Sequence, residues 1–211
     1  MVAGRWYEDN VLPRIITLGC SLHGLDEMRS QVVPLAEGRV LEIGCGGGFN
    51  MRFYDPDRLT SYTGIDPNGA LLDKARDKAR SLRVETEIVE GTAESLPFAD
   101  TSFETVVCTY TLCSVQDPAQ AMAEMRRVLK PRGRLLFLEH GKAPDNGPQR
   151  WQRRIEPVWK RVVGNCHLSR EIGTALRRAG FEVEPLGQKY YDGSPKWAGW
   201  MEWGKARRAG A

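Results

Sequence analysis

Residues 40–50, with the sequence VLEIGCGGGFN, constrain the fold of this chain more than any other stretch. They consist of a short apolar run that ends in an acid, then a glycine-dense turn, then residues that suit a helix start. Glycine lacks a Cβ atom and accepts positive φ, so such a turn lets the backbone approach a ligand closely. A helix that begins there points its free N–H groups at the same place. The segment therefore predicts a ligand-holding strand–turn–helix, although a flexible turn without chemical meaning has the same composition.

The spacing of the glycines separates the two ligands that use this geometry, dinucleotides and S-adenosylmethionine. A dinucleotide fingerprint is G-x-G-x-x-G, and its third glycine would stand at Phe49. The chain instead has Glu-x-Gly-x-Gly-x-Gly, formed by Glu42, Gly44, Gly46 and Gly48. This pattern resembles the nucleotide loop of class I methyltransferases and favours S-adenosylmethionine, with S-adenosylhomocysteine as the product.

Length and cysteine usage exclude several classes of protein. A chain of 211 residues fits one domain with a full core, with room for a small cap. Its five cysteines form no Cys-x-x-Cys pair, so neither a disulfide framework nor a metal site is predicted. No apolar run is long enough to span a bilayer, and the N-terminus lacks the features of a signal peptide. A cytoplasmic protein is the expectation.

Charge is distributed unevenly along the chain. The net charge is +3, but residues 141–211 hold 14 Lys and Arg against 7 Asp and Glu. A basic C-terminal third suits an anionic substrate, a membrane surface or RNA, or is simply a solvated surface. No basic stripe with interleaved aromatic residues lies near the glycine turn, so no nucleic-acid partner is predicted. Peripheral membrane contact stays open, as does the oligomeric state.

Strands and helices alternate along the sequence. The predicted strands cover residues 39–43, 62–65, 84–89, 103–109, 134–139, 181–186 and 196–203, and the last two suit an antiparallel pair. The predicted helices cover residues 26–36, with Asp26 as N-cap, then 49–54, a segment starting at Pro67, 117–129, 148–163 and 169–179. This alternation predicts an α/β fold with a doubly wound, mainly parallel, seven-stranded Rossmann-like sheet and helices on both faces. Residues 1–36 are expected to form an N-terminal helical cap or lid, and residues 37–211 the S-adenosylmethionine-binding domain.

Candidate ligand contacts lie where predicted strands end, because ligands of such sheets bind beyond the carboxyl ends of the strands. Asp66 ends the second strand, 22 positions after Gly44, and its carboxylate suits both ribose hydroxyls of an adenosine; an N-cap for the next helix is the alternative. Pro67 follows it directly. Asn50 suits either the methionine carboxylate of the cofactor or the first-turn cap.

The segment after the third strand resembles that of a known superfamily. Residues 90–98, EGTAESLPF, are similar to the adenine-edge segment of the superfamily that includes ubiquinone and menaquinone methyltransferases. The resemblance implies adenine contacts from Thr92, Ala93 and Glu94. Thr92 stands where many relatives have aspartate, so it would accept through its hydroxyl. Thr109 ends the fourth strand, where members of the superfamily turn backbone carbonyls toward the methionine amine.

A closer resemblance covers almost the whole chain after residue 38. It is carried by residues 46–50, 53–54, 65–68, 106–115, 137–140, 151–152, 157–159 and 165–171. These segments are similar to the methyltransferase-like family whose animal members methylate alkyl thiols. The resemblance implies methyl transfer to a small, apolar thiol. The animal proteins of that family have an N-terminal membrane anchor, and none is expected in this chain.

His140 is the candidate catalytic residue. It follows the fifth strand, and a neutral imidazole can take a thiol proton near pH 7; a structural histidine bonded to nearby backbone is the alternative. Glu139 is expected to be structural, and Cys108 and Cys113 to be mainly apolar filler. S-methylation of a thiol is thus the leading hypothesis. The alternatives are C- or O-methylation of a quinone or phenol, and a non-catalytic S-adenosylmethionine-binding module.

Overall fold

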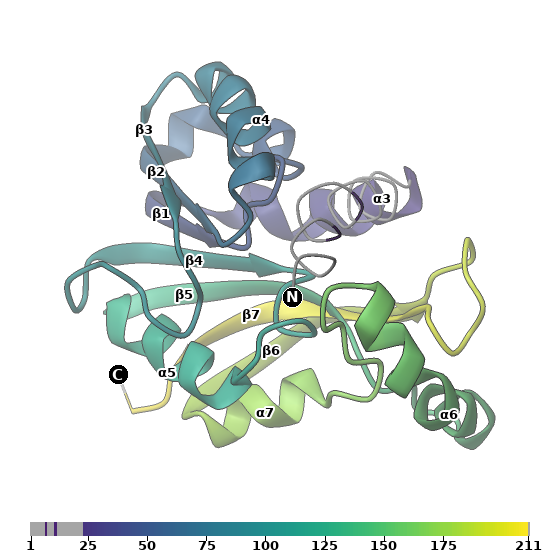
Figure 1. Ribbon diagram of the computed structural model, residues 1–211. Coiled ribbons are helices and arrows are strands. Elements are labelled where there is room, and N and C mark those ends of the chain that lie inside the picture. Colours follow the sequence, from purple (N-terminus) through teal and green to yellow (C-terminus); the bar gives the residue numbers. More distant parts are fainter. Residues whose placement is uncertain (1–6, 8–10, 12–22, 211) are drawn as a thin grey trace.

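A seven-stranded sheet with the order β3-β2-β1-β4-β5-β7-β6 organises the chain (Figure 1). The structure is a computed structural model, and it describes residues 7, 11 and 23–210. The strands are β1 (Gly38–Ile43), β2 (Leu59–Asp66), β3 (Glu85–Glu90), β4 (Phe103–Thr109), β5 (Leu129–His140), β6 (Phe181–Tyr190) and β7 (Trp200–Arg208). The α-helices with described bounds are α3 (His23–Val32), α4 (Gly69–Ala79), α5 (Pro118–Val128), α6 (Asn146–Val162) and α7 (Ile172–Arg178).

The sheet is mixed. Strands β1 to β5 pair in parallel, whereas β7 runs antiparallel to both of its neighbours, β5 and β6. The predicted α/β fold is confirmed in this form. From β1 the chain proceeds outward to β2 and β3, and then returns to place β4 on the other side of β1. The strand order thus reverses between β1 and β4, and ligands of such sheets bind beyond the carboxyl ends of the strands at such a point.

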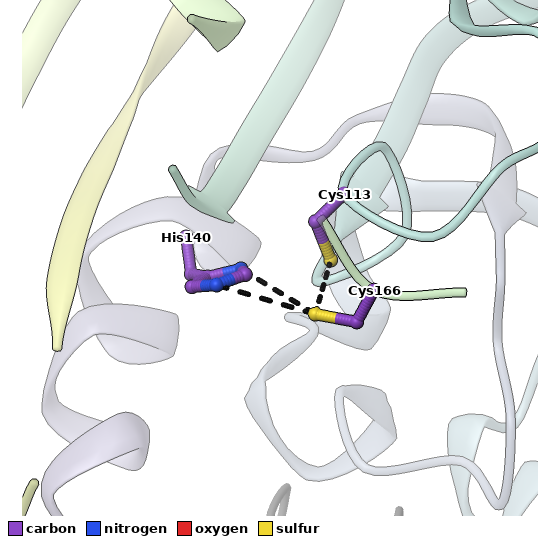
Figure 2. Close-up of side chains that lie close together, drawn as sticks. All are labelled: Cys113, His140 and Cys166. Atoms are coloured by element: carbon purple, nitrogen blue, oxygen red, sulfur yellow. Dashed lines mark hydrogen bonds between the residues drawn. The ribbon is translucent and has the colours of Figure 1, made fainter. Parts of the chain in front are cut away.

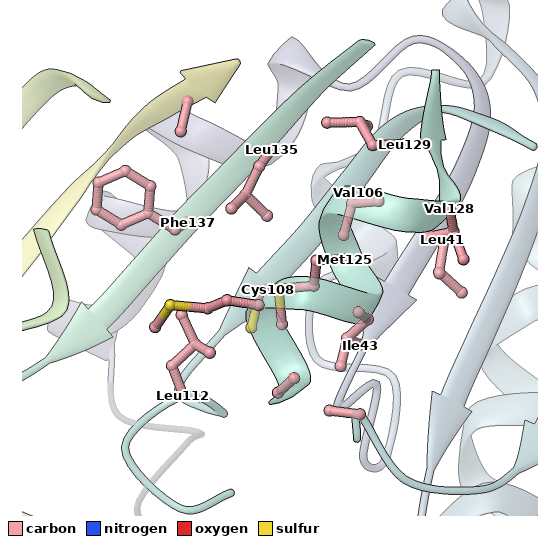
Figure 3. Close-up of a cluster of buried hydrophobic side chains, with 14 of the residues drawn as sticks. Leu41, Ile43, Val106, Cys108, Leu112, Met125, Val128, Leu129, Leu135 and Phe137 are labelled. Atoms are coloured by element: carbon pink, nitrogen blue, oxygen red, sulfur yellow. The ribbon is translucent and has the colours of Figure 1, made fainter. Parts of the chain in front are cut away.

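Alternation along the central strands supplies two apolar cores, one on each face of the sheet. Leu41 and Ile43 pack toward α5 and α7, in the cluster that Figure 3 shows, whereas Val40 packs toward α3 and α4. In β4 the neighbours Val106 and Val107 divide between the two faces in the same way. Figure 1 shows α3 and α4 on one side of the sheet and α5 and α7 on the other. Helices therefore cover both faces of the central strands, and a site can form at the carboxyl ends of these strands.

The described part of helix α3, His23–Val32, already contains Asp26, so the predicted start with Asp26 as N-cap is wrong. Asp26 lies in the first turn, where its carboxylate binds the guanidinium groups of Arg29 and Arg52. The apolar residues of α3 pack into the core on the α4 side. The rest of the expected cap over residues 1–36, including the supposed lid or membrane segment over residues 1–25, lies largely outside the described residues. Among the described helices, none has the length and apolar character that crossing a bilayer requires.

The helix predicted after the glycine turn is only a 3-10 turn, η2 (Met51–Phe53). Tyr54 is already extended, with φ −68° and ψ 142°, and its hydroxyl reaches back to Glu42. Helix α4 begins at Gly69 instead of Pro67, because the Asn68 side chain caps it by accepting from the Ala70 N–H.

The last strand also starts later than predicted. Residues 191–199 form a turn in which Ala198 N–H donates to the Pro195 carbonyl and Tyr191 N–H donates to the Gly199 carbonyl. The turn therefore ends at Gly199, and β7 begins at Trp200, which pairs with Tyr190 of β6.

Replacement of Leu136 in β5 tests the core on the α3 and α4 side. Leu136 is fully buried, so we expect Leu136→Ala to lower the free energy of unfolding by about 2–5 kcal/mol, since lost transfer energy and a residual cavity add. Leu186→Ala in β6 is the matched control, because Leu186 is 37% exposed. Urea unfolding followed by circular dichroism measures both. Equal losses in the two variants would contradict this description of the core.

Candidate functional site

The glycine turn bends tightly over the ends of β2 and β4. Gly44, Gly46 and Gly48 have φ of 71°, 49° and 71°, the left-handed region that favours glycine. A Cβ atom at Gly44 would lie 2.0 Å from the Thr111 hydroxyl, and one at Gly48 would lie 2.8 Å from the Met51 sulfur. The backbone conformation therefore favours glycine at both positions, and at Gly44 the lack of space also requires it.

Asp66 lies beside this turn as a buried carboxylate. Its Oδ2 accepts from the Gly46 N–H at 2.9 Å, and its Oδ1 accepts from the Asn68 N–H at 2.8 Å. Burial raises the pKa of this carboxyl group above its usual value. A Cβ atom at Gly46 would stand 3.9 Å from Oδ2, so the missing side chain leaves space in front of the carboxylate. The cap of α4 is Asn68, and each Asp66 oxygen keeps acceptor capacity for a ligand hydroxyl. This arrangement fits a ribose.

Glu42 joins the first two strands to the turn. Its carboxylate, only 2% exposed, accepts from Asn50 Nδ2 at 3.0 Å, from the Tyr54 hydroxyl at 2.7 Å and from the Tyr62 hydroxyl at 2.8 Å. Burial raises the pKa of Glu42 to about 7, and the three donors oppose that rise. The three donors come from the turn, from the residue after η2 and from β2, so Glu42 positions the turn.

Asn50 extends the same network to β4 and α3. Its Nδ2 also donates to the Thr109 hydroxyl at 2.9 Å, and its Oδ1 accepts from Arg29 Nε at 3.1 Å. The side chain is 1% exposed and makes no cap bond to η2, so the alternative role as first-turn cap is wrong. Sequence reasoning missed Arg29, a buried guanidinium that also stacks on Tyr110 at 5.0 Å. The only signal for it was a basic residue among the apolar positions of α3.

The segment after β3 is anchored to the start of α5. Glu94 Oε1 accepts from the backbone N–H groups of Gln116 at 2.8 Å and Asp117 at 3.3 Å. Ala93 is buried, whereas Thr92 and Pro67 are exposed. Glu94 thereby fixes where the Ala93 N–H and the Thr92 hydroxyl lie.

A second buried carboxylate, Glu139 near the end of β5, holds the turn that follows β4. It accepts from the backbone N–H groups of Thr111 at 2.9 Å, Leu112 at 3.0 Å and Cys113 at 3.4 Å. Burial raises the pKa of Glu139 to about 7. These contacts agree with the structural role expected for this residue.

Three soft or basic side chains meet next to that turn, and we call them the Cys–His–Cys cluster: Cys113, His140 and Cys166. Figure 2 shows the two sulfur atoms, 3.7 Å apart, and Cys166 Sγ at 3.8 Å from His140 Nδ1 and 4.0 Å from Nε2. All three residues are buried. Sequence reasoning missed this cluster because Cys166 stands 53 positions after Cys113 and 26 after His140, so no local spacing reveals it.

The loop after α6 brings Cys166 to this place. The His167 N–H donates to the Cys113 carbonyl at 2.8 Å, and Asn165 Nδ2 donates to the Ser114 carbonyl at 2.9 Å. His167 itself faces Glu156, with its Nδ1 at 3.4 Å from the carboxylate. The loop is thus tied to the turn after β4.

Comparison with known proteins gives this geometry a family. A family profile described as a methyltransferase domain matches residues 41–137. The chain is 40% identical over 168 residues to the rat (Rattus norvegicus) protein named thiol S-methyltransferase TMT1B, covering 76% of this chain and 68% of the rat protein. The human protein of that name is 40% identical over 164 residues, covering 74% and 66%. The chain therefore spans about two thirds of the length of these relatives.

A bacterial relative matches a shorter stretch. The Haemophilus ducreyi ubiquinone/menaquinone biosynthesis C-methyltransferase UbiE is 42% identical over 111 residues, which is 49% of this chain and 42% of that protein.

Solved structures show the same fold. The YcgJ protein of Bacillus subtilis superimposes with a TM-score of 0.68 at 21% identity, covering 90% of this chain and 99% of its own. The [4+2]-cyclase SpnF superimposes with a TM-score of 0.71 at 20% identity, covering 98% and 95%. Likeness at this level of identity concerns the fold alone.

The raised pKa of Glu42 predicts a pH-dependent stability. A carboxyl group whose pKa is about 7 when folded and 4.5 in its usual state destabilises the fold increasingly as pH rises through that window. We expect wild type to lose roughly 3 kcal/mol relative to Glu42→Gln between pH 4.5 and pH 8. Urea unfolding at several pH values measures the difference.

Glu87→Gln, at an exposed position of β3, is the control and should follow wild type at every pH. A difference between wild type and Glu42→Gln that stays constant with pH would mean that the three donors keep Glu42 ionised throughout.

Proposed function

We propose that this chain, which belongs to the class I S-adenosylmethionine-dependent methyltransferases and is related to the thiol S-methyltransferases, methylates the sulfur of a small thiol. Membership of the class rests on the 40% identity to the rat protein over 76% of this chain, together with the methyltransferase-domain match. The methyl donor is S-adenosylmethionine. The thiol acceptor is the proposal, and the name of that relative is the observation that carries it.

The donor side is built from the residues at the ends of β1 to β4. When bound, S-adenosylmethionine supplies an electrophilic methyl group on its sulfonium. We assign the ribose hydroxyls to Asp66 and the close backbone approach to Gly44, Gly46 and Gly48. The segment after β3 serves the adenine, and the strand end at Thr109 serves the methionine portion. Glu42 and Asn50 keep these groups in place through their buried hydrogen bonds.

The acceptor side is proposed to lie at the Cys–His–Cys cluster. In-line displacement requires the nucleophile to be aligned with the methyl group in a pocket that excludes water. A thiol has an ordinary pKa near about 8.5, so a neutral imidazole is a sufficient proton acceptor. His140 ends β5 and is only 6% exposed, which suits that task.

C- or O-methylation of a quinone or phenol is the second candidate. It draws on the similarity to UbiE, but that similarity covers only 49% of this chain. The thiol relatives match more of the chain and so favour a thiol acceptor. A non-catalytic S-adenosylmethionine-binding module is the third candidate, because binding and turnover are separate properties.

Replacement of Asp66 tests the donor site. We expect Asp66→Ala to weaken binding of S-adenosylmethionine by about 10- to 150-fold, the loss of a hydrogen bond to a charged group worth about 1.5–3 kcal/mol. Asp73→Ala, on the exposed side of α4, is the control and should leave affinity unchanged. Isothermal titration calorimetry measures both. Unchanged affinity of Asp66→Ala would remove this residue from the donor site.

An acceptor panel separates the three candidate functions. Alkyl thiols, aryl thiols, phenols and quinones are incubated with the protein and with S-adenosylmethionine labelled in its methyl group. We expect transfer to thiols, detected as labelled thioether. Transfer to phenols or quinones but to no thiol would refute the proposal, and cofactor binding without transfer to any acceptor would support the binding module.

A further inference from the structure

The Cys–His–Cys cluster has the composition of a metal centre. We propose that Cys113, His140 and Cys166 bind a thiophilic divalent cation, Zn²⁺, and leave a fourth coordination position for the sulfur of the acceptor. Three protein ligands with an open fourth position are typical of catalytic zinc, and two cysteines with one histidine are a known set. Structural zinc sites instead have four protein ligands.

The distances between the ligand atoms support this assignment. With Zn–S bonds of about 2.3 Å, two sulfur atoms of a tetrahedral site lie about 3.8 Å apart. Cys113 and Cys166 already hold their sulfur atoms 3.7 Å apart. A sulfur and an imidazole nitrogen on the same ion would lie about 3.6 Å apart. Cys166 Sγ lies 3.8 Å from His140 Nδ1. All three ligand atoms lie within 4.8 Å of one another, so only a small adjustment is needed to bind an ion.

Surrounding contacts hold the ligands from outside, as such contacts do in metal sites. Glu139 fixes the backbone of Cys113, and the His167 N–H donates to its carbonyl. The Arg170 guanidinium donates to the carbonyls of Leu112 and Val115 on the same turn. The turn that contains Cys113 is therefore held from three directions before any ion binds.

Charge and burial also agree. Two thiolates neutralise a divalent cation, so the loaded centre adds no net charge to the interior, where an unpaired charge would be costly. Cys113 is 3% exposed, His140 is 6% exposed and Cys166 is 8% exposed. Water is thus largely excluded from the ligands.

The location gives the ion a task that rests on the proposed function. The acceptor thiol coordinates the ion and gives up its proton to the bulk solvent as it enters the site, because a metal-bound thiol is deprotonated. The resulting thiolate forms a bond to the methyl carbon, and the bond between that carbon and the sulfonium sulfur breaks, its electron pair passing to the leaving sulfur. The thioether product is neutral and dissociates from the ion. His140 then acts as a ligand, and the ion replaces it as the group that activates the thiol.

Metal binding is measured first and without reference to activity. The full chain is purified under a thiol-free reductant, treated with a chelator, loaded with Zn²⁺ and desalted, and its metal content is determined by plasma mass spectrometry. We expect about one tightly bound ion per chain. Loading with Co²⁺ should give the near-ultraviolet sulfur-to-metal charge-transfer band and the visible absorption of a tetrahedral ion. A wild-type chain that retains no Zn²⁺ and shows no such bands overturns the site.

Ligand variants locate the ion. Cys113→Ser, Cys166→Ser and His140→Ala should each weaken Zn²⁺ binding by at least about tenfold. Cys45→Ser is the control, because Cys45 packs against Gly64 in β2 and its replacement also leaves four cysteines in the chain. Circular dichroism identifies variants that stay folded, and double variants in which Ser replaces both cysteines give a second test. Retention of Zn²⁺ by folded ligand variants overturns the site.

Activity then distinguishes failure of the ion's role from failure of the proposed function. Thiol methylation that disappears with the chelator and returns with Zn²⁺ supports the proposed role. Thiol methylation at an unchanged rate in the metal-free protein overturns the role of the ion and leaves His140 as the proton acceptor. Zn²⁺ binding without methylation of any thiol keeps the metal site and overturns the thiol acceptor.

Discussion

The donor site depends on the hydrogen bonds that the buried carboxylate of Glu42 accepts. This carboxylate ends no helix and faces no solvent, yet it takes hydrogen bonds from β2, from the glycine turn and from the extended residue that closes η2. Tyr62 belongs to β2, and Asn50 carries the network onward to Thr109 at the end of β4. An acceptor with two oxygens can join this many donors only when it is buried among them, because water would otherwise compete for each bond. Because Glu42 precedes the glycine turn and Asn50 follows it, their hydrogen bond joins the two ends of the segment that contains Gly46.

Glu139 does for β5 what Glu42 does for β1. Both carboxylates lie near the carboxyl ends of central strands. Glu42 accepts from side chains of the turn after its own strand and of β2, and Glu139 accepts from backbone N–H groups of the turn after the neighbouring strand β4. The first orders the turn over the donor site, and the second orders the turn that contains Cys113. Burial of two acids is costly unless each is fully hydrogen-bonded, so the two turns and the two carboxylates stabilise one another. The geometry of both turns thus has a common physical origin.

Much of the fold could be predicted from short-range patterns. The apolar run over β4 and the Asp117–Pro118 start of α5 are local signals, and both elements lie where these patterns indicate. The errors occur where distant contacts decide. Tyr54 is extended because Glu42 holds its hydroxyl, and Cys166 meets Cys113 only because the loop after α6 folds back onto the turn after β4. Neither the secondary-structure propensity of a residue nor the spacing of residues in the sequence predicts either of these contacts. Fold alone is equally silent about chemistry, since a cyclase and a methyltransferase-family chain share this sheet.

Burial of the Cys–His–Cys cluster has a consequence for methyl transfer to a thiol. A thiolate and a sulfonium carry opposite charges that vanish as the new carbon–sulfur bond forms, and water stabilises the separated charges more than the transition state. A dry pocket therefore favours the reaction. The same dryness opposes formation of the thiolate, so the protein must supply a group that removes the thiol proton where no water reaches. His140 and the two sulfur atoms beside it are the groups that the described residues bring to this end of β5, either as a base or as ligands of an ion. How the acceptor thiol loses its proton thus depends on whether these three side chains act as a base or bind an ion.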